Sequence, residues 1–292
     1  MDIIQALVEE FKLKREQVEK TVALIDEGNT IPFIARYRKE ETGSLDDTVL
    51  RDLDDRLTYL RNIEKRKEEV RGLITEMGKM TDEISAAIDG AKTITEVDDI
   101  YRPFRPHRKT RASVARERGL EPLSELILSQ LEKYEPTLEE QAEAFVDEEK
   151  QVACAADALA GACDIIAESI SDNADFRKMI RKATFDTGML HTKNIKDEDS
   201  VYSQYYDYAD RLCKVPSHRI LAINRGEKEE FLRVSVSVEK GMILNYLCGE
   251  LITCPRSPAV KYIEAAIVDG YDRLIAPSIE REIRNDLFDT AS

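Results

Sequence analysis

The stretch SLDDTVLRDLDDRLTYLRNIEKRKEEVR, residues 44–71, decides the fold class. Its apolar residues recur every three or four positions, which is the repeat of one helix face. They are Leu45, Val49, Leu53, Leu57 and Leu60. Charges of both signs alternate over the remaining positions, as on a helix face in water. The stretch therefore predicts one long amphipathic helix that begins at Ser44 and runs to about Arg71.

The residues just before this helix, GNTIPFIARYRKEETGSLDD (28–47), admit two roles. In the first they form a corner between helices, in which Pro32 begins a turn and three side chains anchor it. The three are Phe33, Ile34 and Tyr37. Arg36 and Arg38 then bind helix-end carbonyls or carboxylates. In the second role these cations contact phosphate directly. We favour the corner and keep phosphate contact as the alternative.

Helical periodicity continues along most of the chain. Residues 152–170 (VACAADALAGACDIIAESI) are small and apolar nearly all round, as in a buried helix. Residues 231–238 (FLRVSVSV) alternate apolar and polar and are the one good strand candidate, and residues 191–200 (HTKNIKDEDS) are typical of a linker. We predict a mainly α fold: a multi-helical scaffold with an inserted helix-turn-helix-like domain and at most a short β element near 231–238.

Composition excludes several classes of protein. The net charge is −15, so the whole chain repels nucleic acid and anionic membranes, and any nucleic-acid site must be a local basic patch. Five cysteines without a CxxC pair fit a reducing compartment. The acidic N-terminus MDIIQALVEEF is unlike a signal peptide, and no apolar run reaches membrane-spanning length. These features predict a cytoplasmic protein without a membrane partner.

The most basic segment is YRPFRPHRKTRASVARERG, residues 101–119. Seven Lys or Arg residues against one acid, Glu117, give it a charge of +6, which leaves −21 on the rest of the chain. Arginine can pair with phosphate, and Tyr101 and Phe104 can stack on bases. The candidate phosphate-contacting residues are Arg102, Arg105, Arg108, Lys109, Arg111 and Arg116. The alternative is that these cations pair with acids elsewhere in the chain.

Two helices are predicted in and after this segment, at about residues 111–118 and 122–131. Gly119 and Pro122 separate them, and Ala115 lies four residues before Gly119, as in many helix-turn-helix motifs. That spacing is a weak signal when taken alone.

A catalytic or cofactor site is not recognisable in the sequence. The three histidines, His107, His191 and His218, are far apart, and none has a His or Cys neighbour at metal-ligand spacing. The GxxxxGK[ST] and GxGxxG nucleotide-binding motifs are absent. Ser217 beside His218 lacks the strand-elbow-helix context of a nucleophile. We therefore predict a chain that is not an enzyme and holds no cofactor and no metal.

Four phrases are more specific together than any one alone. They are EGNTIPFIARYRKEETGSLDD (27–47), DDIYRPFRPHRKTRASVARERGLEPL (98–123), PSHRILAINRGE (216–227) and PSIEREIRNDL (277–287). In this order and spacing they resemble the Tex family of bacterial transcription accessory proteins. The resemblance implies a cytoplasmic, non-catalytic, nucleic-acid-binding protein with a helical N-terminal region that contains a helix-turn-helix-like domain.

In the family, ribonuclease-H-like, helix-hairpin-helix and C-terminal OB-fold RNA-binding domains follow this region. The resemblance thus implies that this chain is the N-terminal part of such a protein and ends before those domains. It also implies weak binding of nucleic acid by this part, because the OB-fold domain is the family's principal nucleic-acid-binding element.

The composition shift after Arg71, the linker at 191–200 and the resemblance together predict a discontinuous domain. Residues 1–72 and 200–292 are expected to pack as one helical scaffold, with residues 73–199 inserted as the helix-turn-helix-like domain. The predicted function is nucleic-acid binding in a transcription accessory protein, through RNA or DNA backbone contacts of residues 102–118. The alternative is a protein-interaction scaffold that docks transcription machinery without binding nucleic acid.

Overall fold

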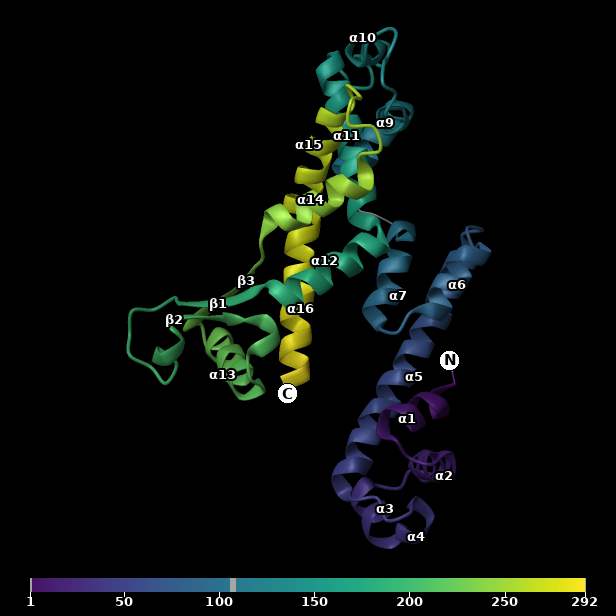
Figure 1. Ribbon diagram of the computed structural model, residues 1–292, viewed down its shortest axis with the longest axis vertical. Helices are drawn as coiled ribbons and strands as arrows, with labels where there is room; N and C mark the ends of the chain where they lie inside the picture. Colours follow the sequence, from purple (N-terminus) through teal and green to yellow (C-terminus); the bar gives the residue numbers. More distant parts are fainter. Residues whose placement is uncertain (1, 106–108, 292) are drawn as a thin grey trace. The chain divides into compact units, whose positions relative to one another are not determined.

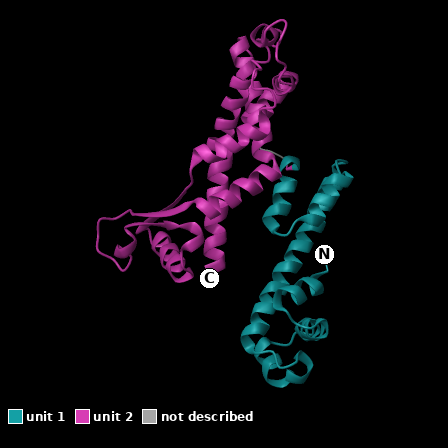
Figure 2. Cartoon of the chain, viewed as in Figure 1, with its two compact units in different colours: residues 1–104 teal, residues 105–292 magenta. Residues whose placement is uncertain are grey.

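The computed structural model describes residues 2–105 and 109–291 and is mainly helical (Figure 1). This confirms the predicted fold class. The chain divides into two units, residues 1–104 and residues 105–292 (Figure 2).

The first unit is built along one long helix, α5 (Asp47–Glu76). The helix begins later than predicted, because the carboxylate of Asp46 accepts a hydrogen bond from the backbone N–H of Val49 at 2.9 Å and so caps it. Ser44 lies outside the helix with a φ of 63°. The long amphipathic helix itself is confirmed, and it continues five residues beyond the predicted end at Arg71.

Both ends of α5 are covered by shorter helices. Its N-terminal half packs against α1 and α2, where Leu53 and Leu57 share a buried cluster with Leu7 and Val18. Its C-terminal half buries Val70 in a second cluster with residues of α6 and α7. The shorter elements of this unit are α1 (Ile3–Phe11), α2 (Arg15–Asp26), α3 (Ile31–Tyr37), α4 (Lys39–Thr42), α6 (Asp82–Gly90), α7 (Ile94–Tyr101) and the 3-10 turn η1 (Arg102–Phe104).

Gly43 ends α4 in a left-handed conformation with a φ of 70°. A Cβ atom here would lie 2.2 Å from Nε2 of Gln17, the atom that binds the carbonyl of Thr42 at 3.1 Å. We expect Gly43→Ala to lower the free energy of unfolding by about 1–2 kcal/mol, because an L-residue is strained in this conformation.

Urea denaturation of the two alanine variants Gly43→Ala and Gly72→Ala measures this. Gly72 lies inside α5 with open space around it, so alanine there should stabilise the chain by about 0.5–1 kcal/mol. Equal shifts for the two variants would contradict the assigned backbone conformation.

The second unit surrounds the buried helix α11 (Ala155–Asp172), as predicted for residues 152–170. Helices α8, α9, α10 and α15 pack on it, and one continuous cluster of buried residues runs from Ala112 to Leu287. The helices of this unit are α8 (Arg111–Glu117), α9 (Glu121–Leu128), α10 (Leu138–Glu143), α12 (Ala174–Thr187), α13 (Ser217–Lys228), α14 (Lys240–Leu251), α15 (Val260–Asp269) and α16 (Ala276–Ala291).

Helices α15 and α16 are joined by a π-helical segment, η4 (Gly270–Ile275), and run on as one rod, drawn in yellow in Figure 1. At Gly270 the rod approaches α11 closely, since a Cβ atom there would lie 3.0 Å from the carbonyl oxygen of Ala167. Ile263 and Ile267 of α15, before this segment in the chain, are buried, and so are Ile279 and Ile283 of α16, after it.

A small antiparallel sheet completes the second unit. Within the described residues it has three strands in the order β2-β1-β3: β1 (Met189–Asn194), β2 (Asp207–Arg211) and β3 (Leu232–Ser237). Short 3-10 turns, η2 (Ser203–Tyr205) and η3 (Leu212–Lys214), flank β2. The register places Thr192 between Tyr208 and Val234.

The sheet confirms one prediction and corrects two. Strand β3 falls where the alternation of residues 231–238 placed it. Residues 191–194, predicted to belong to a linker, lie in β1, and β2 was not predicted. The reason is that the buried positions of β1 are Leu190 and Thr192, so a polar side chain hides the alternation.

The discontinuous domain stays a prediction. Within the second unit, residues on both sides of position 200 share one core, because α11 packs against α15 and η4. The predicted scaffold of residues 1–72 and 200–292 takes its residues from both units.

Candidate nucleic-acid interface

The start of the basic segment belongs to the first unit. Arg102 lies in η1 and is half-buried, as is Arg105 at the beginning of the second unit, while Arg108 lies outside the described residues. Tyr101 is buried beside Val97, with the guanidinium of Arg66 5.8 Å from its ring centre. The expectation that Tyr101 offers a ring for base stacking is therefore wrong, because this ring belongs to the core.

Helix α8 is fastened at both ends to one carboxylate of α11. Thr110 caps the helix, and its hydroxyl donates to Oε1 of Glu168 at 2.8 Å. In the last turn of the helix, Nη1 of Arg116 donates to Oε2 of Glu168 at 2.6 Å. The side chain of Glu168 is only 11 % exposed, and Glu121 lies 3.5 Å from Nε of Arg116. Arg116 is thus engaged in an ion pair that holds α8 on α11.

Lys109 and Arg111 are exposed at the start of α8, and neither forms an ion pair with another described residue. The positive charge of Arg111 still acts on two acids of the unit. Burial raises the pKa of Asp164, and Arg273 and Arg111 oppose that rise. Hydrogen bonding to Arg273 lowers the pKa of Asp269, and Arg111 adds to this effect. Arg111 therefore faces water near an acidic neighbourhood.

The predicted helix, turn and helix are present. Gly119 lies in the turn with a φ of 80°, and the N–H of Leu120 binds the carbonyl of Ala115 at 3.1 Å, which closes α8. Leu120 and Leu123 are fully buried and attach the second helix to the core. Gly161 of α11 leaves room for Leu120, whose Cδ1 would lie 2.4 Å from a Cβ atom there. The motif brings Lys109 and Arg111 to the N-terminal end of α8.

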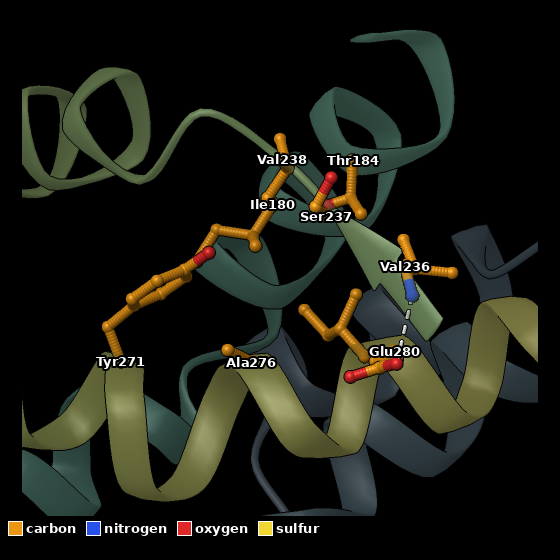
Figure 3. Close-up of a pocket in the computed structure, with 9 residues that line it drawn as sticks. Ile180, Thr184, Val236, Ser237, Val238, Tyr271, Ala276 and Glu280 are labelled. Atoms are coloured by element: carbon orange, nitrogen blue, oxygen red, sulfur yellow. Dashed lines mark hydrogen bonds between the residues drawn. The ribbon is translucent and has the colours of Figure 1, made fainter. Parts of the chain in front are cut away.

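A cavity of about 190 Å³ lies among α12, β3, η4 and α16 (Figure 3). Glu280 lines it, and its Oε1 accepts a hydrogen bond from the N–H of Val236 at 3.0 Å. Because β3 is an edge strand of the described sheet, this carboxylate occupies a backbone donor that pairing leaves open. Burial, together with the charge of Asp272, raises the pKa of Tyr271 on the cavity wall. The cavity is thus lined by the neutral phenol of Tyr271 and by an edge of β3 whose Val236 N–H is already bound to Glu280.

The corner at residues 28–47 differs from the prediction. Ile34 is fully buried, but Phe33 is 37 % exposed and Tyr37 is 69 % exposed, so the two rings do not anchor the turn. Arg38 pairs with Glu41 at 3.3 Å, in line with the expected role of this cation. Arg36 is exposed and forms no ion pair with another described residue. The sequence did show that Phe33 and Tyr37 share one face of the helix, because they are four residues apart.

Two further findings concern residues 2–105 and 109–291. They contain no group of three or more His, Cys, Asp or Glu side chains placed to hold a metal ion. No helix among them has both the length and the apolar character needed to cross a membrane.

Comparison with known proteins gives matches over two stretches of the chain. Residues 1–75 match the Tex-like protein N-terminal domain, and residues 134–292 match the family described as Tex central region-like. Uncharacterized protein YdcI of Bacillus subtilis (strain 168) is 42 % identical over 291 residues, which is 98 % of this chain and 40 % of that protein.

Two other relatives have informative names. Transcriptional accessory protein Tex of Neisseria gonorrhoeae is 36 % identical over 82 % of this chain and 31 % of its own length. S1 RNA-binding domain-containing protein 1 of Homo sapiens is 28 % identical over 98 % of this chain and 30 % of its own length. This chain thus spans about 30 to 40 % of the length of the relatives it matches. Since the central-region match alone covers more than half of its residues, the chain belongs to the Tex family.

Proposed function

We propose that this chain is a non-catalytic region of a cytoplasmic transcription accessory protein and binds the backbone of RNA or DNA weakly. The names of the relatives, one a transcriptional accessory protein and one an S1 RNA-binding domain-containing protein, support a role connected with nucleic acid. The observation that carries the phosphate-contacting role is the exposure of Lys109 and Arg111 at the start of α8.

The six candidate cations contribute differently in this proposal. Lys109 and Arg111 contact phosphates, because their charges face water without an ion-pair partner among the described residues. Arg116 keeps α8 in place through Glu168 and so supports the surface indirectly. Arg102, Arg105 and Arg108 remain predicted contacts.

The test is fluorescence-anisotropy titration of the whole chain with single-stranded RNA over a salt series. We expect Lys109→Gln with Arg111→Gln to weaken binding and to reduce the slope of log K against log salt by about 0.7 for each lost phosphate contact. A matched control, Lys182→Gln with Lys214→Gln, removes two exposed cations from elsewhere in the same unit and should leave the slope unchanged.

Arg116→Gln separates the two roles of the segment. It should lower the thermal stability of the chain and leave the salt slope near its original value, because Arg116 is paired with Glu168. If the intact chain fails to bind RNA and duplex DNA at low salt, the phosphate-contacting role is wrong. The alternative, a scaffold that docks transcription machinery, would then stand.

A further inference from the structure

The outer face of α3 and α4 in the first unit presents aromatic rings and cations together. We call this surface the α3–α4 platform and define it by Phe33, Arg36, Tyr37, Arg38 and Lys39, all of which are exposed. The ring centres of Phe33 and Tyr37 lie 5.2 Å apart with their planes at 44°. The rings are therefore neighbours that do not cover each other face to face.

Contacts with α2 and α5 hold the backbone of the platform in place. Ile34 is 0 % exposed and packs with Leu24 and Leu50, which fixes α3 on α2 and α5. Nε2 of Gln17 binds the carbonyl of Thr42 at 3.1 Å and fastens the end of α4 to α2. The backbone of α3 and α4 therefore needs no reordering on binding, which lowers the entropic cost of contact with a ligand.

The exposed groups of the platform differ in whether other side chains hold them. The guanidinium of Arg38 lies 5.7 Å from the ring centre of Phe33 and pairs with Glu41 at 3.3 Å, so this cation is fixed. Tyr37 is 69 % exposed and keeps most of its ring open to water. Arg36 and Lys39 flank Tyr37 in sequence and form no ion pair with another described residue.

This chemistry distinguishes between two classes of partner. The core of a protein–protein interface is enriched in Tyr, Phe and Arg but depleted of Lys, so Lys39 is the residue of the platform that a protein partner does not account for. Here rings and cations follow one another along the chain, in the order Phe33, Arg36, Tyr37, Arg38 and Lys39. Single-stranded nucleic acid needs this combination, because bases stack on aromatic rings while the adjoining phosphates meet cations.

We propose that the α3–α4 platform binds single-stranded nucleic acid by stacking a base on Tyr37, with Arg36 and Lys39 at the adjoining phosphates. The proposal rests on the nucleic-acid role proposed above and adds a second surface, in the other unit of the chain. Duplex nucleic acid gains nothing from the ring of Tyr37, since its bases are already stacked on each other. The platform therefore makes the chain prefer single strands.

Substitutions at Tyr37 test stacking directly. Binding of the whole chain to a fluorescein-labelled 15-nucleotide RNA is measured beside binding to a duplex DNA. We expect Tyr37→Ala and Tyr37→Leu to weaken RNA binding roughly 5- to 100-fold, which is the effect of losing one stacked base. Tyr37→Phe keeps the ring and should bind like the original chain. None of the three should change duplex binding.

Two controls accompany this series. Phe185→Ala removes another exposed ring, which is 40 % exposed on α12, and should leave RNA binding unchanged. Arg36→Gln with Lys39→Gln is compared with Lys65→Gln plus Lys79→Gln, two exposed lysines of the same unit. Only the first pair should reduce the salt slope. Photocrosslinking with 4-thiouridine RNA, followed by mass spectrometry, should place an adduct on the peptide that contains Phe33 and Tyr37.

The outcomes separate this proposal from the previous one. Tyr37→Leu binding RNA like the original chain, equal losses on RNA and duplex, or adducts confined to other peptides would each overturn the platform. The exposed rings would then suit a protein partner instead. If Lys109→Gln with Arg111→Gln has no effect while Tyr37→Leu weakens binding, the phosphate-contacting role of the basic segment is wrong and the α3–α4 platform is supported. The opposite pattern removes the platform alone.

Discussion

Glu282→Ala is expected to lower the free energy of unfolding by about 3–5 kcal/mol, because it removes the carboxylate that forms an ion pair with the buried cation of Arg177. Arg177 of α12 is 0 % exposed, and its Nη2 donates to Oε1 of Glu282 at 2.5 Å and to the hydroxyl of Ser278 at 2.9 Å. Arg181 donates to the other carboxylate oxygen at 2.7 Å. One carboxylate of α16 thus compensates two cations of α12.

The same residue makes stability depend on pH. Burial alone would raise the pKa of Glu282, but the charges of Arg177 and Arg181 outweigh it, so the folded pKa lies below its ordinary value near 4.5. The carboxylate binds more protons in the unfolded chain, so its stabilising contribution is complete above about pH 4.5 and is lost as the pH falls through the folded pKa.

Urea denaturation at pH 7 and at several lower values measures both effects. The difference between the original chain and Glu282→Ala should shrink as the pH falls below 4.5. Asp289→Ala changes an exposed acid of the same helix and should stay within about 0.5 kcal/mol at every pH. A difference that is constant with pH would show that the ionised carboxylate is not what stabilises this contact.

The second large effect is expected in the first unit. Leu53→Ala should lower the free energy of unfolding by about 2–5 kcal/mol, since Leu53 is 0 % exposed in the cluster that joins α5 to α1 and α2. The loss combines the transfer free energy of the side chain with the cavity that remains. Thermal and urea denaturation give the value.

Two companion variants calibrate Leu53→Ala. Leu53→Met nearly conserves volume and should lose less than about 1.5 kcal/mol. Thr58→Ala changes an exposed position of the same helix and should stay within about 0.5 kcal/mol. A small loss for Leu53→Ala would mean that α5 is not held by its apolar face.

The elements that sequence patterns predicted best are those whose apolar residues repeat without interruption. Leu53, Leu57 and Leu60 mark α5 from the sequence because every one of them is buried. Strand β1 escaped prediction because its second inward position is Thr192, which is 1 % exposed although its side chain is polar. The apolar–polar alternation of a sequence marks only apolar side chains as buried, so a buried polar residue such as Thr192 interrupts the pattern.

The candidate interface could be predicted only in part, for a related reason. The concentration of cations in residues 101–118 is visible in the sequence, whereas the partner of each cation depends on residues far away. Arg116 is matched by Glu168, 52 positions later, and nothing local to either residue marks the pair. The exposure of Phe33 and Tyr37 was missed because aromatic residues are usually buried, and the i, i+4 spacing does not say which face turns inward.

The π-helical segment η4 determines how far α16 is rotated about the common helix axis relative to α15. Each π-type bond spans one residue more than an α-helical bond, and one residue corresponds to about 100° of rotation around a helix axis. The segment thus offsets the apolar stripe of α16, which meets α13 and β3, from that of α15, which meets α11. If residues 270–275 were rewound as plain α-helix without any change in length, Ile279 and Ile283 would turn by about 100° away from their partners. The π-helical backbone of this segment is therefore as important for packing as residue identity is in the core, because it sets the angle between two packing faces.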